Sequence, residues 1–344
     1  MIGCRNFFLY LCLSPLLAIA QPAAPVSLVK IENENRVDVY IGGSLFTSFL
    51  YPDSLEKPVL FPINDAGNYP VTRGFPRDPR PGEPTDHPHH LGCWFTYEQV
   101  NGLDFWNNSY AVPAEKKSLY GWIKTDSLLE ISSGSIGTLR FHANWVNQQN
   151  QVLLEETTFY EFSGIGQERT IDRITDLKAD TDILFADAKD GLLGFRLTHE
   201  LQIPEKKDQT FTDNQGNKTM VKRDTFASGN YLTSEGKSGD AAWSTRGKWC
   251  KVFGKVGNDS VSITIFDHVK NPGYPTFWHA RGYGLFAANP LGEKIFTGGK
   301  SSLNLRIKKG DTIRFRYRIL IQNGNTTVTV NYLNQSAEKF NQDY

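Results

Sequence analysis

The sequence predicts an all-β protein, a large antiparallel β-sandwich with a short C-terminal helix. Apolar and polar residues alternate along most of the chain, and glycine, asparagine and aspartate separate the alternating segments. No strand–helix–strand rhythm interrupts them, so the strands are expected to pair antiparallel in two sheets packed face to face. The 344 residues suffice for one large sandwich, and we expect a single domain over residues 21–344.

The individual strands follow from this alternation. The strongest alternation predicts half-buried strands at Leu139–Trp145, Phe195–Leu201, Val261–Ile265 and Ile313–Ile319. Shorter strands, bounded by turn residues, are expected at Val26–Ile31, Val37–Ile41, Leu45–Leu50, Val152–Phe162, Ile183–Ala188 and Leu303–Ile307. The polar side chains Arg314, Arg316 and Arg318 of one such strand are expected to form a solvated or salt-bridged sheet face.

Two segments depart from the strand pattern. A helix is expected at the C-terminus, capped by Asn325 or Thr326, because apolar residues there recur at helical spacing, namely Val330, Leu333, Ala337 and Phe340. Residues 202–240 are polar and lack sustained alternation, which predicts a loop excursion on the surface or over a binding site.

The N-terminus has the features of a secretory signal. Arg5 precedes an apolar stretch at Phe7–Leu17, and Ala18-Ile19-Ala20 matches the small-residue cleavage pattern. The apolar stretch is too short for a membrane anchor. We therefore expect residues 1–20 to be a signal peptide and the protein to be exported, periplasmic or secreted, with no integral membrane segment after cleavage.

Charge and cysteine content limit the partners and the covalent chemistry. The chain has 37 Lys and Arg against 37 Asp and Glu, which leaves no basic surplus for phosphates, so a nucleic-acid partner is not expected. Cleavage of the signal would leave two of the four cysteines, Cys93 and Cys250. A disulfide between them and two separate buried thiols are both open.

The densest cluster of chemically active side chains is a histidine-rich loop. His87, His89 and His90 lie within four positions, directly after a segment rich in proline and glycine that predicts a rigid loop. Imidazoles in such a loop are suited either to binding a divalent metal, with all three as ligands, or to proton transfer near neutral pH. The sequence leaves both alternatives open.

Tryptophans accompany this loop. Trp94 follows it on an expected strand, and Asn101-Gly102 predicts a turn into a second strand that ends at Trp106. Aromatic rings beside a polar loop are suited to stacking on the apolar faces of sugar rings, although core packing explains either tryptophan alone.

A second polar cluster lies near the end of the chain. His279, Arg281 and Tyr283 alternate, so in an extended segment all three would point the same way, beside Trp278. Asp267, earlier in this segment, continues an apolar strand face and is expected to have a partner such as an arginine or a histidine. We expect this cluster and the histidine loop to converge on one cleft, because neither alone offers a base, an acid and an anion-binding group.

Several of these segments resemble the PmoA-like family of exported bacterial proteins, which takes its name from a methane oxygenase. That name does not fit this sequence, because a subunit of a membrane oxygenase needs several membrane-spanning segments, and none is expected here after the signal peptide. The family is similar to an ulvan oligosaccharide dehydratase, and Leu91 departs from its pattern, which has arginine there. The matching stretches span nearly the whole mature chain: Pro70–Phe75, Asp86–Phe95, Asn101–Trp106, Ala241–Trp249 and Ile265–Pro290.

The resemblance implies a lyase that eliminates water from a uronic acid at the non-reducing end of an oligosaccharide. Such chemistry requires a cation at the carboxylate, a base for the C5 proton and an acid for the departing hydroxyl. The two clusters contain residues suited to these roles: we expect Arg73 and Arg281 to bind the carboxylate, His279 to be the base, and Tyr283, His89 or His90 to be the acid. Trp94, Trp106 and Trp278 would contact the sugar.

Two other functions stay open at this point. A glycoside hydrolase would normally use two carboxylates, and Asp86, Asp104 and Asp267 are the ones available near the clusters. A non-catalytic carbohydrate-binding sandwich would need aromatic stacking but no concentrated histidines. The histidines therefore favour an enzyme.

Overall fold

The computed structural model describes residues 23–205, 208–212, 218–221, 226–324 and 328–344. The predicted signal peptide, residues 1–20, lies outside this part of the chain. Among the described residues, no helix is long and apolar enough to cross a membrane.

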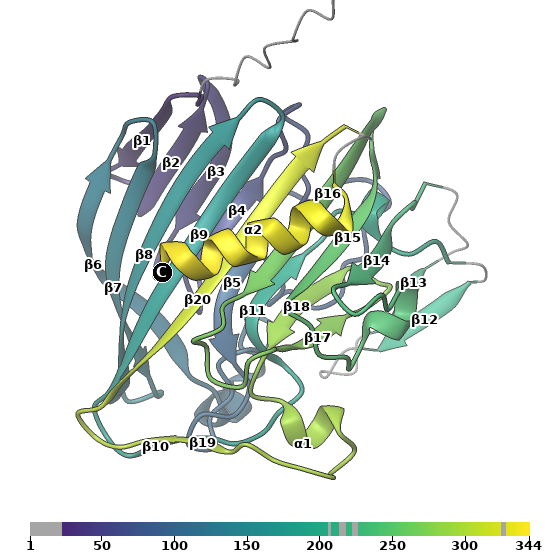
Figure 1. Cartoon of the computed structure of the whole chain (residues 1–344). Coiled ribbons are helices and arrows are strands. Elements are labelled where there is room, and N and C mark those ends of the chain that lie inside the picture. The colour runs from purple at the N-terminus through teal and green to yellow at the C-terminus, as the bar shows by residue number, and fades with distance from the viewer. Residues whose placement is uncertain (1–22, 206–207, 213–217, 222–225, 325–327) are drawn as a thin grey trace, which may run out of the picture.

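Two antiparallel sheets of eight strands each form the body of the protein, as the alternation predicts (Figure 1). We call them sheet I and sheet II. Sheet I has the order β1(Val26–Ile31), β2(Arg36–Ile41), β3(Ser44–Leu50), β4(Val59–Ile63), β5(Cys93–Tyr97), β11(Gly191–Arg196), β18(Leu285–Asn289) and β17(Phe277–Ala280). Sheet II has the order β14(Asn230–Thr233), β15(Trp249–Val256), β16(Asp259–Asp267), β20(Thr312–Asn323), β9(Glu168–Ala179), β8(Val152–Ile165), β7(Gly137–Val146) and β6(Trp122–Ser132).

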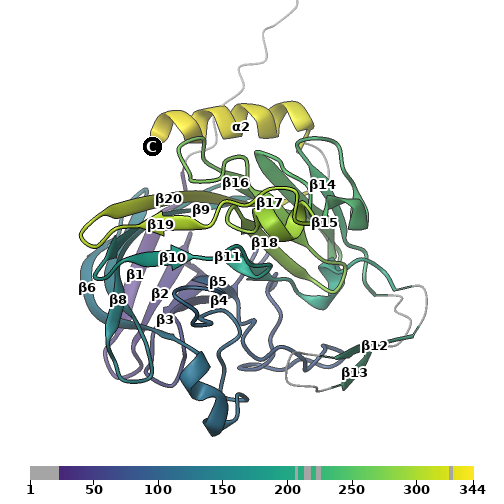
Figure 2. The same ribbon diagram turned by 90° about the horizontal axis from the view of Figure 1, so that it is seen from below.

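Short elements complete the fold. Two further two-stranded antiparallel sheets pair β10(Ile183–Phe185) with β19(Leu305–Ile307) and β12(Gln209–Thr212) with β13(Lys218–Val221). The β12–β13 pair belongs to the polar excursion at 202–240 and projects from one side of the sandwich (Figures 1 and 2). The short helices are η1(Ala114–Leu119), η2(His199–Leu201), η3(Gly239–Ala242) and α1(Glu293–Phe296).

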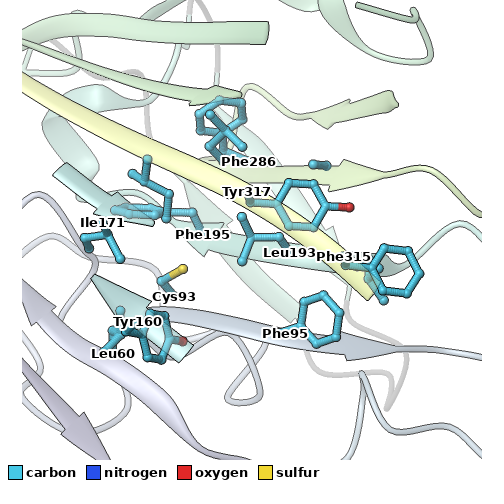
Figure 3. Close-up of a cluster of buried hydrophobic side chains, with 14 of the residues drawn as sticks. Leu60, Cys93, Phe95, Tyr160, Ile171, Leu193, Phe195, Phe286, Phe315 and Tyr317 are labelled. Carbon is cyan, nitrogen blue, oxygen red and sulfur yellow. The ribbon is translucent and has the colours of Figure 1, made fainter. Parts of the chain in front are cut away.

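The main hydrophobic core lies between the two sheets. Figure 3 shows Cys93 and Phe195 from sheet I close to Tyr160 and Phe315 from sheet II, and all four are buried. Cys93 and Cys250 are both buried free thiols, so the two cysteines do not pair.

The C-terminal helix, α2(Val330–Asp343), covers the outer face of sheet II (Figure 2). Leu333, Ala337 and Phe340 are buried as predicted, against Trp249 and other apolar residues of sheet II. Its N-cap is Thr329, whose hydroxyl accepts a hydrogen bond from the backbone N–H three residues later.

The structure of the C-terminal helix bears on two further details of the prediction. The expected caps, Asn325 and Thr326, lie outside the described residues. Val330 is 48% exposed rather than buried, because it is the first residue of the helix and precedes the turn that contacts the sheet.

Two strands in the structure differ from those expected from the sequence. The strand expected at Phe195–Leu201 ends at Arg196, and η2 follows within a few residues. The segment from Leu103 to Trp106 makes only isolated bridges instead of a second strand.

Candidate functional site

Sheet I has a second apolar layer on the face that points away from sheet II. Trp94, Trp106, Leu285 and Ala287 form this outer cluster, with Tyr283 partly buried against it. Because sheet I is covered on both sides here, every residue of the central strands β5, β11 and β18 is buried. This explains why their sequences do not simply alternate.

The register of the strands places polar side chains on the same outer face. Gly194 pairs with Trp94, so Arg196, two residues further along β11, points outward as well. His279 pairs with Ala287, an outer-cluster residue, and therefore also points outward. The histidine loop lies over this face.

Arg73 and Asp86 hold the histidine loop in place. The Arg73 guanidinium is fully buried and donates to the Asp86 carboxylate (Nη1 to Oδ1, 2.9 Å) and to the backbone oxygen of His87 (2.9 Å). Arg196 also donates to Asp86 Oδ1, at 3.2 Å. The structure thus places Arg73, predicted as a substrate clamp, inside the loop, where both terminal nitrogens of its guanidinium are engaged.

The surroundings of Asp86 keep its carboxylate ionised. Burial alone would raise the pKa of Asp86, but the hydrogen bond from His87 and the charges of Arg196 and Arg73 outweigh it and hold this pKa well below its usual range. A permanently charged carboxylate is thus fixed beside an imidazole.

His87 is the imidazole that Asp86 orients. Its Nδ1 lies 2.7 Å from Asp86 Oδ2, so Nδ1 donates its proton to the carboxylate, and in the neutral ring this leaves Nε2 as the proton acceptor. The His87 side chain is 18% exposed, whereas those of its histidine neighbours are buried. Its backbone has a φ of 48°, a strained value for a residue with a side chain.

His90 has a structural role. Its ring is stacked between His87 (centroids 4.9 Å apart) and Trp94 (5.1 Å). Trp106 Nε1 donates to its Nε2 at 3.2 Å, and its Nδ1 lies 3.3 Å from Arg196 Nη1. Burial lowers the pKa of His90 well below its usual value, so the ring is neutral. His90 is therefore not accessible as the predicted catalytic acid.

His89 is also buried, but neither of its ring nitrogens has a hydrogen-bond partner among the described residues. Burial first, and then the charge of Lys57, lower its pKa well below the usual value.

Among the described residues, the three histidines are not arranged as a set of metal ligands. The rings of His87 and His90 are stacked with an interplanar angle of 5°, which does not direct their nitrogens to a common centre. In the described part of the chain, no three His, Cys, Asp or Glu side chains are placed to hold a metal ion. The geometry thus favours the proton-transfer alternative.

The three tryptophans expected to contact sugar are 0–1% exposed. Trp94 is covered by His90 on one side and lies against Gly194, where an added Cβ would come 2.5 Å from the indole. Trp106 belongs to the same outer cluster, and Trp278 packs in the core against Phe286. Protein atoms therefore cover the three rings that were expected to stack on sugar.

The predicted extended segment at 279–283 is a strand followed by a tight turn. β17 ends at Ala280, and the backbone N–H of Gly284 donates to the oxygen of Arg281 (2.9 Å). His279 therefore separates from Arg281 and Tyr283. It is 1% exposed, its Nδ1 lies 3.4 Å from Asp190 Oδ1, and burial lowers its pKa to about 3. As the predicted base, His279 is inaccessible.

Arg281 and Tyr283 line a cavity of about 340 Å³ together with Glu205, Asp240 and Trp243. The Arg281 guanidinium lies 5.6 Å from the Tyr283 ring centre and 5.5 Å from that of Trp243. No carboxylate in the described part of the chain forms an ion pair with Arg281, so this cation can accept an anionic ligand. Burial raises the pKa of Tyr283 to about 12, which keeps its phenol protonated.

Tyr283 connects the cavity to the histidine loop. Its ring is stacked on His87 with centroids 5.8 Å apart and an interplanar angle of 11°. The Arg196 guanidinium lies 4.9 Å from the same ring. The two clusters therefore meet, and they do so at His87 and Tyr283.

Sequence reasoning missed two residues of the site. Arg196 was hidden in an alternating strand, where an arginine ordinarily faces solvent. Lys57 lies in a loop without any motif, yet it is 4% exposed, and burial lowers its pKa to about 8.

Asp267 proves to be unrelated to the site. It ends β16 in sheet II, and its carboxylate accepts hydrogen bonds from Asn271 Nδ2 (2.8 Å) and from the backbone N–H of Thr276 (2.8 Å). The expected arginine or histidine partner is wrong, because neutral donors satisfy a carboxyl whose pKa burial raises to about 7.

Solved structures with related architecture include several carbohydrate-active proteins. A GH36 α-galactosidase from Geobacillus stearothermophilus has a TM-score of 0.40 and 8% identity, over 87% of this chain and 41% of its own. A galactose mutarotase-like protein from Clostridium acetobutylicum has a TM-score of 0.40 and 8% identity, over 88% of this chain and 99% of its own. An α-galactosidase from Lactobacillus brevis has a TM-score of 0.38 and 9% identity, over 94% of this chain and 41% of its own.

The chain spans about two fifths of the length of these α-galactosidases. No curated protein matches the sequence. The model of a family of unknown function, DUF6807, matches residues 36–334, and the chain belongs to this family.

Proposed function

We propose that this protein is a sugar-processing enzyme that eliminates water from a uronic acid at the non-reducing end of an oligosaccharide. The observation that carries the proposal is the contact between His87, oriented by Asp86, and Tyr283, which shares a cavity with the cation Arg281. This contact unites a base, an acid and an anion-binding group.

Arg281 binds the uronate carboxylate. Its guanidinium can grip both carboxylate oxygens, and it neutralises the charge that develops when the neighbouring C5–H bond breaks. Glu205 and Asp240, in the same cavity, are placed to accept hydrogen bonds from sugar hydroxyls.

His87 is the base that removes the C5 proton. The Asp86 carboxylate fixes the tautomer in which Nε2 is unprotonated, and it stabilises the imidazolium that forms. This assignment replaces His279, whose ring is buried beside Asp190.

Tyr283 is the acid. It donates its phenolic proton to the hydroxyl that leaves C4, so that a C4–C5 double bond forms and one water molecule is released. His87 and Tyr283 are stacked, and the proton gained by one returns to the other through solvent after each turnover.

The proposal also covers the identity of the sugar and the cellular location of the protein. The resemblance to PmoA-like proteins and to an ulvan dehydratase supports ulvan-derived uronates as the first substrates to try. Signal cleavage after residue 20 and export are proposed with it, and mass spectrometry of the mature N-terminus tests them.

Product analysis tests the reaction. Elimination produces a conjugated unsaturated uronate, which absorbs in the near ultraviolet and is lighter than its substrate by the mass of one water. A saturated product with a new reducing end would contradict elimination.

Glycoside hydrolysis is the alternative that one observation favours. Burial raises the pKa of Asp104 to about 6 and that of Asp190 to about 7, values suited to a general acid. Asp104, however, already accepts hydrogen bonds from the backbone of Trp106 and from Asn107, and Asp190 is buried, so elimination by the more exposed His87 is preferred.

A further inference from the structure

Another cavity, of about 340 Å³, lies on the outer face of sheet II. It is formed mainly by β15 and β16, at the end of the sheet where α2 begins (Figure 1). Val252 of β15 pairs with Ile263 of β16, and both belong to the main core, so the residues on either side of them point outward. The outward-pointing residues that line the cavity are Lys251, Phe253, Lys255, Ser260 and Ser262.

The cavity has two cations and, among the described residues that line it, no carboxylate. The Lys251 ammonium donates to the backbone oxygen of Val328 at 3.3 Å and lies 4.9 Å from the Phe253 ring centre. Neither Lys251 nor Lys255 forms an ion pair within the described part of the chain. Burial lowers the pKa of Lys251, because an ammonium group is held partly away from water without a compensating anion. An anionic ligand would supply this missing charge.

Ser262 adds a buried hydroxyl to the same cavity. The residue is 6% exposed, and its Oγ makes no hydrogen bond to any described residue. A buried hydroxyl without a hydrogen-bond partner destabilises the protein, and a ligand oxygen in the cavity would satisfy it. Ser262 pairs directly with Phe253, so its hydroxyl lies on the same face as the aromatic ring.

We propose that this cavity binds an acidic sugar through a sulfate or carboxylate group. Lys251 and Lys255 hold the anionic group, and the Ser262 hydroxyl donates to one of its oxygens. Phe253, which is 36% exposed, contacts the apolar face of the sugar ring. The volume lies at the low end of the range for ligand pockets, roughly 300–1,000 Å³, and therefore suits a single sugar residue.

The choice of a saccharide as the ligand rests on the proposed function. The cavity lies on the outer face of sheet II, whereas His87 and Tyr283 lie over the outer face of sheet I, so it does not hold the uronate that reacts. It is a non-catalytic site that retains another acidic unit of the same class of polysaccharide. A sulfate ester and a carboxylate share the required chemistry, and the experiment distinguishes them.

The test titrates the mature protein by isothermal titration calorimetry with a sulfated methyl glycoside, a methyl uronide and the neutral parent sugar. Lys251→Met should raise the Kd of the preferred acidic sugar at this cavity by a factor of about 10 or more. Lys124→Met is the matched control and should bind like the wild type. Lys124 also lies on sheet II, but on β6 at the far edge, where it donates to Asn150 (2.8 Å).

The number of binding sites separates this proposal from the proposed function. An acidic sugar that also binds at Arg281 occupies two sites in the wild type and one in Lys251→Met. If Arg281 binds none, the numbers are one and none, and the cavity on sheet II is still supported. The acidic sugar that binds more tightly in a manner dependent on Lys251 identifies the anionic group. Equal site numbers and equal Kd values in the wild type and Lys251→Met would overturn the proposal.

Phe253→Ala tests whether the ligand is a sugar. It should weaken binding of the acidic sugar by a factor of about 2–10 and leave the binding of inorganic sulfate or acetate unchanged. An inorganic anion that binds the wild type as tightly as the sugar does would rule out a saccharide ligand.

A measurement on the wild type covers a variant that fails to fold. The preferred acidic sugar should shift the backbone amide NMR resonances of Gly254 and Ser262, which line the cavity. Unchanged resonances at saturating sugar would refute the site.

Discussion

His87 and Tyr283 lie ring over ring, 5.8 Å apart, although they come from distant segments of the chain. The hydrogen bond from His87 Nδ1 to Asp86 leaves Nε2 of the neutral ring as the proton acceptor. Burial raises the pKa of Tyr283, so its phenol stays protonated. The contact therefore places a base and an acid side by side, next to Arg281.

The first prediction concerns the base. His87→Gln should lower kcat by a factor of about 10²–10⁴, the usual contribution of a positioned general base, and leave the Tm nearly unchanged. The matched control is His142→Gln, because His142 is also bound through Nδ1 to an aspartate, Asp126 (2.8 Å), but on β7 of sheet II. Steady-state kinetics of both variants check this, and equal losses would contradict it.

The second prediction concerns the buried charges around Asp86. Asp86→Asn leaves Arg73 and Arg196 without their carboxylate, so the free energy of unfolding should fall by about 3–5 kcal/mol. Urea unfolding at neutral pH measures this. A loss below about 1 kcal/mol would show that the arginines find other partners.

The third prediction is the pH dependence of the same pair. Because the pKa of Asp86 is lower in the folded protein than in the unfolded chain, the ionised carboxylate stabilises the fold at neutral pH. This stability is lost as the pH falls below the usual aspartate value of about 4. The wild type should therefore lose more stability than Asp86→Asn between neutral pH and about pH 3. If the free energy of unfolding of the two proteins fell in parallel with pH, this prediction would be wrong.

Much of the fold could be predicted from sequence because burial on one face leaves an alternating pattern. β1 begins and ends at the predicted residues, and the arginine stripe of β20 forms ion pairs as expected, Arg314 with Asp176 and Arg318 with Asp172 (both 2.6 Å). The outer face of sheet I lacks such a pattern, because a second apolar layer covers it.

The site was predicted in its segments but not in its roles. Composition located the histidine loop and the 279–283 segment, and both contribute. It did not reveal that the chain turns at Arg281, which separates His279 from Tyr283. Nor did it reveal that Arg73 donates to Asp86 and to the backbone of the histidine loop. Such assignments depend on register and long-range contacts, which one sequence does not display.

The fourth prediction tests the packing beneath the site. Gly194→Ala would place a Cβ 2.5 Å from the Trp94 indole, so the free energy of unfolding should fall by about 1–3 kcal/mol. Gly134→Ala is the control, because its added Cβ would come no closer than 3.3 Å to another atom. Urea unfolding compares the two, and equal effects would argue against the close contact at Trp94.

The fifth prediction concerns the anion-binding residue. Arg281→Lys should raise KM and lower kcat together, since an ammonium lacks the planar pair of donors that grips a carboxylate. Kinetics on a uronate, compared with competitive inhibition by the corresponding neutral sugar, separate charge recognition from general damage. A variant with unchanged KM would exclude Arg281 from carboxylate binding.

The most direct test of the central claim follows the C5 hydrogen of the substrate. An oligosaccharide with deuterium at C5 of its terminal uronate should react more slowly than the unlabelled one and give an unsaturated product without that deuterium. His87→Gln should slow this conversion by the same factor of about 10²–10⁴. A product that retains the deuterium, or turnover that is undiminished by the loss of His87, would contradict proton abstraction by His87.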